Sequence, residues 1–266
     1  MDKSRIFSVP TFRINEILSF DFSAGFLSQA SKNQYLKIVI YIMAVAIPVY
    51  LVVREPDLGT AITTIVMTIV AMLVSGVPRK ILIGGLVAIL LLSPVVYLRL
   101  KPYQKERVVS FINPAADPLG SGYNVSQSKI AVGSGGLMGK GFGGATQSQL
   151  RFLPVAQIDF IFSGWAEATG FVGSIVMIIA FAILIARIFI VSITSRDKFG
   201  MIIAAGAGSI IFFQAFVNIG MNIGIMPVTG IPLPFVSYGG TSFLINSALI
   251  GMVQSIYLRR KALKFA

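Results

Sequence analysis

Long apolar runs alternate with short polar segments along most of this 266-residue chain. Six runs approach the length of about 20 apolar residues that a helix needs to cross the hydrocarbon core of a bilayer. They cover residues 38–53, 58–77, 81–98, 160–186, 199–223 and 235–258. The pattern predicts an all-α integral membrane protein with about six transmembrane helices. A long segment, residues 99–159, separates the third and fourth runs, and we expect it to contain helical pieces of its own.

The composition supports this prediction, because 55% of the residues are hydrophobic and only 12% are charged. Ordinary soluble domains carry about 25% charged residues. Residues 1–34 carry charges at intervals and lack the compact apolar stretch of a cleaved signal peptide. We therefore expect residues 1–34 to form a cytoplasmic or interfacial segment and residues 35–266 to form one membrane domain.

The basic residues predict the orientation, because Lys and Arg in short loops normally stay in the cytoplasm. Fourteen of the 22 Lys and Arg precede the first run, follow the sixth, or lie in the second-to-third and fourth-to-fifth loops. Both termini are therefore expected in the cytoplasm, with residues 99–159 outside. The net charge of +12 then reflects topology, and the absence of a basic face interleaved with aromatics argues against nucleic acid as a partner.

The chain contains no Cys and no His, which excludes disulfides, thiol chemistry, a histidine base and a histidine-ligated metal. Any chemistry must use carboxylates, hydroxyls and cations. The external segment has seven basic residues against three acidic ones, and a cationic, glycine-bearing surface suits a lipid-linked pyrophosphate. A solvated loop attracted to anionic headgroups explains the charge equally well. The glycines of "GSGGLMGKG" superficially resemble a phosphate-binding loop. The stretch lacks the Gly-Lys-Ser/Thr ending of such a loop, so we do not expect a nucleotide site.

The stretch "NIGMNIGIMPVTGIPLPFVSYGGTS", residues 218–242, interrupts the entry to the last apolar run with three prolines and several glycines. Non-helical backbone near membrane depth persists only where protein or a water-filled cavity surrounds it. The stretch predicts a re-entrant turn that lines a polar cleft. An ordinary external loop followed by a kinked helix is the alternative.

Several blocks resemble the shape, elongation, division and sporulation (SEDS) family of membrane polymerases. They are "EPDLGTA", "LKPYQKERVVSFINP", "DPLGSGYNVSQSKIAVGSGG", "TQSQLRFLP", "DFIF" and the Pro- and Gly-rich stretch. "KPYQ" and "QSKIAVGSGG" are more similar to the elongation branch than to the division branch. The resemblance implies a glycosyltransferase of the bacterial cytoplasmic membrane that polymerises lipid II into peptidoglycan strands during cell elongation. It also implies a class B penicillin-binding protein as partner, beside lipid II, the nascent glycan strand and membrane lipid.

The chain departs from the family pattern in two respects. Family members usually have ten spans, and this chain is expected to start after the fourth, without a Gln-Pro-Ser-Glu block. Gln157 and Ile158 stand where the family has His and Thr, and Ala168 stands where it has a second Glu. Two alternatives therefore stay open: a shortened, non-catalytic member that binds a partner, and a flippase or transporter of a lipid-linked precursor.

Asp159 lies directly before an apolar run, where a carboxylate is costly unless water, cations or a role accompany it. It matches the aspartate proposed as catalytic in the family. The resemblance implies a general base that accepts the proton of a sugar 4-hydroxyl. This hydroxyl attacks the anomeric carbon with inversion, and undecaprenyl pyrophosphate leaves. The alternative role is a cap of the following helix.

Further polar residues are candidates for contacts with the substrate. The leaving pyrophosphate requires positive charge, and the sugars require hydrogen-bonding groups. The candidates are Lys129, Lys140, Arg107, Arg151, Gln127 and Ser237. No metal ligands are assigned. A divalent cation could bridge Asp159 and pyrophosphate, but Glu167 follows two helical turns later, about 12 Å along the axis, too far to share the ion.

Small residues in the fourth and fifth runs are expected to form the surface that receives the partner's transmembrane span. Small side chains permit close helix approach in lipid. The residues are Gly170, Gly173, Gly206 and Gly208.

Overall fold

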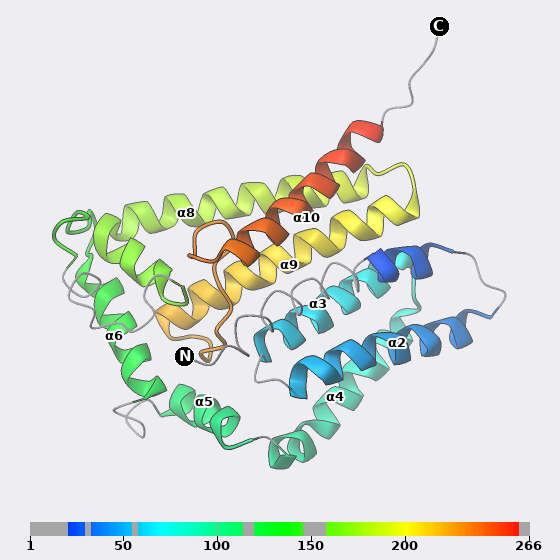
Figure 1. Ribbon diagram of the computed structural model, residues 1–266, viewed down its shortest axis with the longest axis horizontal. Helices are drawn as coiled ribbons and strands as arrows, with labels where there is room; N and C mark the ends of the chain where they lie inside the picture. The colour runs from blue at the N-terminus through cyan, green and yellow to red at the C-terminus, as the bar shows by residue number, and fades with distance from the viewer. Residues whose placement is uncertain are drawn as a thin grey trace, which may run out of the picture. The chain divides into compact units, whose positions relative to one another are not determined.

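The computed structural model describes residues 21–29, 33–54, 58–99, 101–113, 120–145 and 158–260. Within these ranges all regular structure is helical (Figure 1), as the apolar pattern predicts. The labelled helices are α2 (Gln34–Arg54), α3 (Leu58–Ser75), α4 (Arg79–Arg99), α5 (Pro102–Ile112), α6 (Ser121–Ser134), α8 (Ile161–Ile193), α9 (Lys198–Ile223) and α10 (Gly240–Arg259). The long segment between the third and fourth runs contains α5 and α6, so its predicted helical pieces are confirmed.

Each predicted apolar run coincides with a helix. Among the described residues, α2, α8, α9 and α10 are long and apolar enough to cross a membrane. The apolar part of α3, Gly59–Ser75, is shorter, and the 21-residue α4 has basic residues at both ends. The membrane character is therefore confirmed, and the crossing of the bilayer by α3 and α4 stays a prediction.

The backbone divides into two compact units. Unit 1 comprises Met1–Gly85, Ile183–Phe213 and Gly240–Ala266, and unit 2 comprises Leu86–Ala182 and Gln214–Gly239. In unit 1, α2 packs against α3. The hydroxyl of Tyr41 on α2 donates a buried hydrogen bond of 2.9 Å to Ser23 Oγ, in a short helix at residues 21–28. This part of the expected N-terminal segment therefore packs inside unit 1.

The glycines expected to receive a partner's span mostly pack inside the chain. Gly206 and Gly208 are buried on α9. A Cβ added at Gly208 would lie 3.1–3.3 Å from Ile188 and Phe189 of α8, within unit 1. Gly170 is also buried, against the backbone of residues 137 and 139. The prediction of an open seam is wrong for Gly170, Gly206 and Gly208, which are buried within this chain, and stays a prediction for the half-buried Gly173.

In unit 2, α5 contacts α6. Pro102 begins α5, where the absence of its N–H removes no hydrogen bond of the helix. Gln104 Oε1 accepts the N–H of Lys101 at 2.9 Å. The buried side chains of Ala131 on α6 and Phe160 before α8 form a small core with Val228. This core joins α6 to the start of α8 and to the non-helical segment 224–239. The helix after that segment begins at Gly240 instead of residue 235, so the predicted interruption of the helix is confirmed.

The helix α8 is broken at Gly170, which the apolar run 160–186 did not reveal. Gly170 has φ 70° and ψ −164°, a conformation that is essentially restricted to glycine. Figure 1 shows α8 as two helical segments that meet at an angle. A break of this kind leaves main-chain carbonyls unpaired before it and N–H groups unpaired after it.

A glycine-rich loop, residues 135–141, satisfies these main-chain groups. The N–H groups of Lys140 and Gly141 donate to the carbonyls of residues 167 and 168 at 3.0 and 2.9 Å. The N–H groups of Phe171 and Val172 donate to the carbonyls of residues 136 and 137 at 2.9 and 3.2 Å. The loop thus supplies the partners that the break removes, as buried main-chain groups require.

The close approach of the two backbones explains the glycines of "GSGGLMGKG". A Cβ at Gly135 or Gly139 would overlap the main-chain carbonyl of Ala166 or Ala168. A Cβ at Gly170 would overlap the main chain of residues 137 and 139. These glycines therefore serve helix packing in unit 2.

Replacement of Gly170 by Ala is expected to destabilise the protein strongly. The backbone conformation alone costs about 1–3 kcal/mol for a residue with a side chain, and the overlap adds to this cost. We expect Gly170→Ala to lower the free energy of unfolding by about 3 kcal/mol or more, measured by thermal melting in detergent. Gly133→Ala on α6 is the matched control, because a Cβ there meets nothing within 4 Å and alanine favours the helix. Equal melting of both variants and the native chain would contradict this role of the break.

Candidate functional site

Two asparagines on α9 hold the main chain of Asp159. Asn218 and Asn222 are one helical turn apart and fully buried, so their side chains share one face. Asn218 Nδ2 donates to the Asp159 carbonyl oxygen at 3.0 Å, and Asn222 Nδ2 donates to the same atom at 3.1 Å. We call this pair the amide clamp. It fixes the segment that precedes α8 against α9, within unit 2.

Every hydrogen-bonding group of the Asn222 side chain is used. Its Nδ2 also donates to the Asn218 carbonyl at 2.8 Å. Its Oδ1 accepts the N–H of Ser163 at 3.0 Å and lies 3.3 Å from the hydroxyl of Ser128, which donates at 2.8 Å to the main-chain carbonyl of Asn222. A buried amide is favourable only when its groups are paired, so Asn222 ties α6, α8 and α9 together in one arrangement.

The same network holds the non-helical segment 224–239. Asn218 Nδ2 donates to the Ile231 carbonyl at 2.8 Å. The Ser237 hydroxyl donates to the Ile158 carbonyl at 2.6 Å and accepts the N–H of Leu233 at 2.8 Å. Residues 158 and 159 are therefore bound from two sides, by α9 and by the segment that follows it.

The carboxylate of Asp159 lies beside a glycine turn. Asp159 is partly exposed and precedes Ile161, the first residue of α8, by two positions. A Cβ added at Gly230 would lie 3.9 Å from Asp159 Oδ2. Arg107 Nη1 on α5 donates to the carbonyl of the neighbouring Thr229 at 3.3 Å. The turn at 229–230 thus lies near the carboxylate and accepts a hydrogen bond from a guanidinium.

The conformation of segment 224–239 is unusual. Gly224 and Gly230 have φ of 81° and 75°, and Phe235 has φ 62°, which is rare for a residue with a bulky side chain. The side chain of Lys129 on α6 crosses Gly224 so closely that a Cβ there would overlap it. Strained backbone of this kind concentrates at functional sites, where surrounding contacts maintain it.

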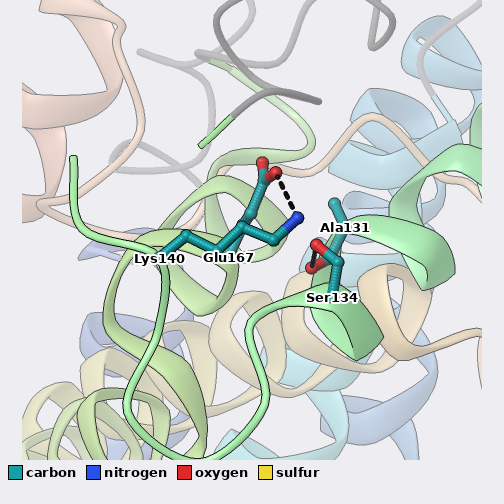
Figure 2. A network of polar contacts seen from close by, with 4 residues as sticks. All are labelled: Ala131, Ser134, Lys140 and Glu167. Carbon is teal, nitrogen blue, oxygen red and sulfur yellow. Dashed lines mark hydrogen bonds and ion pairs between the residues drawn. The ribbon is translucent and has the colours of Figure 1, made fainter. Parts of the chain in front are cut away.

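Lys140 takes part in a second polar contact. Its Nζ lies 3.5 Å from Glu167 Oε1, as Figure 2 shows. The Glu167 side chain is fully buried, whereas that of Lys140 is 36% exposed. A buried carboxylate requires a compensating charge, so Lys140 neutralises Glu167 and strengthens the attachment of the glycine-rich loop to α8.

The structure thus gathers some of the predicted site residues on one segment. Asp159, Ser237, Arg107 and Lys129 all contact segment 224–239 or the residue before Asp159. Gln127 is half-buried on α6, and Arg151 lies outside the described residues.

The arrangement provides a carboxylate, which can accept a proton, and cations, which can stabilise an anionic leaving group. Glycine at position 230 leaves room beside the carboxylate. Within the described ranges, no three acidic side chains gather in a cluster that could hold a metal ion.

Sequence reasoning missed the amide clamp, although both asparagines stand in a block that was singled out. The signal was their spacing of four residues within an apolar helix. Two amides on one helix face in a membrane span require buried polar partners. The partners themselves, the main chains of residues 159 and 231, could not be read from the spacing.

The chain matches the family model described as "Cell cycle protein" (FtsW, RodA, SpoVE) over residues 15–262. Peptidoglycan glycosyltransferase MrdB of Escherichia coli strain K12 is 41% identical over 233 residues, which is 87% of this chain and 62% of MrdB. Stage V sporulation protein E of Bacillus subtilis is 35% identical over 94% of this chain and 69% of that protein. The chain spans less than two thirds of the length of MrdB.

Solved structures show the same fold. A chain of a peptidoglycan synthase complex, described as coordinating polymerization and crosslinking, matches with a TM-score of 0.80 and 30% identity, over 94% of this chain and 70% of that one. Rod shape determining protein RodA of Thermus thermophilus matches with a TM-score of 0.61 and 26% identity, over 90% of this chain and 62% of RodA. The chain belongs to the FtsW, RodA and SpoVE family of cell cycle proteins, the SEDS family.

Proposed function

We propose that this chain carries the catalytic centre of a peptidoglycan glycosyltransferase that polymerises lipid II into glycan strands during cell elongation. The name of MrdB, a peptidoglycan glycosyltransferase, supports the reaction class. The observation that carries the proposal is the fixed position of Asp159, held through its main chain by Asn218 and Asn222. A catalytic carboxylate must be positioned before the substrate arrives.

In this proposal Asp159 is the general base. It accepts the proton of the 4-hydroxyl of the incoming sugar, whose oxygen then forms the new bond to the anomeric carbon of the growing strand. The bond to undecaprenyl pyrophosphate breaks with inversion, and the pyrophosphate leaves with the electron pair. Base assistance of this kind typically contributes about a hundred- to ten-thousand-fold in rate.

The cations have different parts in this reaction. Arg107 and Lys129 contact the segment that lies beside Asp159, so they are the first candidates for stabilising the pyrophosphate. Lys140 pairs with Glu167 and acts chiefly in positioning. Ser237 uses its hydroxyl in two main-chain hydrogen bonds, which makes it a positioning residue for Asp159.

The proposed partner is a class B penicillin-binding protein. The similar chain in a peptidoglycan synthase complex that coordinates polymerization and crosslinking supports it. Crosslinking requires a second activity next to the polymerase. The bacterial cytoplasmic membrane, where a lipid-linked precursor is available, is the proposed location.

Replacement of Asp159 by Asn is expected to abolish glycan-strand formation while the protein stays folded. Asn keeps the volume and can still cap a helix, but it cannot accept the proton. The native chain and the variant are compared with purified lipid II and the partner, alone and with the N-terminal half of a full-length relative. Polymer length is measured on a gel, and we expect a loss of at least about a hundredfold in rate.

Glu106→Gln is the matched control, because Glu106 is an exposed carboxylate on α5. It is expected to retain full polymerisation, and thermal melting verifies that both variants fold. If the native chain polymerises lipid II and Asp159→Asn does so equally well, the carboxylate serves as a cap and the proposed base is wrong. Transport of lipid II without polymerisation by the native chain would favour a flippase.

We also propose that the loop at residues 135–141 faces outward and that the turn between α8 and α9 faces the cytoplasm. The distribution of Lys and Arg supports this orientation. Cysteines introduced singly at Met138, which is 80% exposed, and at Ser195 test it, because no native thiol competes. A membrane-impermeant thiol reagent added outside intact cells should label position 138 and spare position 195. The reverse labelling would overturn the orientation.

A further inference from the structure

A cavity of about 520 Å³ lies in unit 1, where the turn between α8 and α9 meets the end of α10. It contains none of the residues assigned to the proposed glycosyltransferase centre. Its lining combines charged groups at the ends of the helices with apolar side chains of α9 and α10. A ligand for this cavity must therefore be amphipathic.

Three arginines supply the positive charge of the cavity: Arg196 from the turn, and Arg259 and Arg260 from the end of α10. The guanidinium carbon of Arg260 lies 3.9 Å from the centroid of the Tyr257 ring, and its Nη1 donates to Thr194 Oγ1 at 3.3 Å. These contacts orient the guanidinium without neutralising its charge, which leaves it available to an anion.

Two carboxylates, Asp21 and Asp197, also line the cavity. Asp197 caps α9, because its Oδ2 accepts the N–H of Gly200 at 3.3 Å. Among the residues that the structure describes, no ion pair within 4.0 Å joins Asp21 or Asp197 to an arginine of the cavity. Neither carboxylate of the cavity thus pairs with an arginine, and three positive charges face two negative ones.

The apolar part of the lining lies deeper. Ile203 of α9 is only 4% exposed, and Met252 and Ile256 of α10 are half-buried. Phe199 is 39% exposed at the start of α9. An inorganic anion would use the arginines alone, whereas a lipid would use both the arginines and this apolar surface.

We propose that this cavity binds an anionic phospholipid of the cytoplasmic leaflet. The arginines contact the headgroup phosphate, and the beginning of an acyl chain lies against Phe199, Met252 and Ile256. The predicted topology places this end of unit 1 in the cytoplasm, and anionic lipids concentrate in that leaflet. The chemistry recognised is a phosphate ester with a net negative charge, joined to an apolar chain.

The test measures binding of dioctanoyl-phosphatidylglycerol to the full chain in a neutral detergent, by titration calorimetry. The cavity variant carries Arg196→Gln, Arg259→Gln and Arg260→Gln. The matched control carries Arg79→Gln, Lys80→Gln and Arg187→Gln, which remove equal charge from the same predicted side but do not line the cavity. We expect saturable binding to the native chain and an affinity lower by on the order of a hundredfold in the cavity variant. The control should stay within about threefold of the native chain.

Dioctanoyl-phosphatidylcholine and inorganic phosphate separate the two parts of the ligand. Both should bind at least about tenfold more weakly than phosphatidylglycerol, because phosphatidylcholine has no net negative charge and inorganic phosphate has no apolar chain. Inorganic phosphate bound as tightly as the lipid would overturn the lipid assignment. Equal affinity of the cavity variant and the native chain, or equal weakening by both triple variants, would overturn the site.

A second variant keeps every charge. Met252→Trp narrows the apolar part of the cavity and should weaken phosphatidylglycerol binding several-fold while leaving weak phosphate binding unchanged. If the arginine variant does not fold, Met252→Trp alone tests whether the cavity binds the lipid. Unchanged lipid affinity in Met252→Trp would contradict the proposed position of the acyl chain.

Discussion

The main-chain carbonyl of Asp159 receives two buried amide donors, and the site in unit 2 depends on this contact. Asn218 and Asn222 can donate to it only if α9 stays helical through both residues. The remaining groups of these amides bind Ser128, Ser163 and Ile231, so α6, α8 and segment 224–239 are held by the same network. An apolar environment makes an unpaired amide costly, which favours this one arrangement over alternatives.

The same rule explains the break in α8. A membrane cannot hydrate the main-chain groups that a broken helix releases, so another part of the chain must bind them. The glycine-rich loop does so on both sides of Gly170, and the Lys140–Glu167 ion pair reinforces it. Both devices hold the end of the first segment of α8, and Asp159 directly precedes the start of that segment.

The sequence predicted the helices well, because six apolar runs with almost no charge have few other stable states in a membrane. It also located the non-helical segment before α10, because Pro227, Pro232 and Pro234 oppose helix. The break at Gly170 was not predicted, because a single glycine is common in a long apolar run. Its conformation depends on the loop at residues 135–141, which is distant in the sequence. The seam expected at Gly208 was wrong, because small residues indicate close packing without indicating the partner. Asp159 was identified by resemblance, whereas its attachment to Asn218 and Asn222 required the structure.

The melting temperature of Asn222→Ala, compared with Asn246→Ala, tests the amide clamp most directly. Both asparagines are buried on membrane helices, but within the described part of the chain Asn246 Oδ1 has no hydrogen-bond partner and its Nδ2 makes one long contact of 3.5 Å. Loss of the Asn222 side chain removes the acceptor of the buried Ser163 N–H, at a cost of about 1–3 kcal/mol, and one of the two donors to the Asp159 carbonyl. The account predicts that Asn222→Ala melts roughly 5 °C or more below Asn246→Ala in the same detergent. Equal melting temperatures would contradict the stabilising role of the clamp.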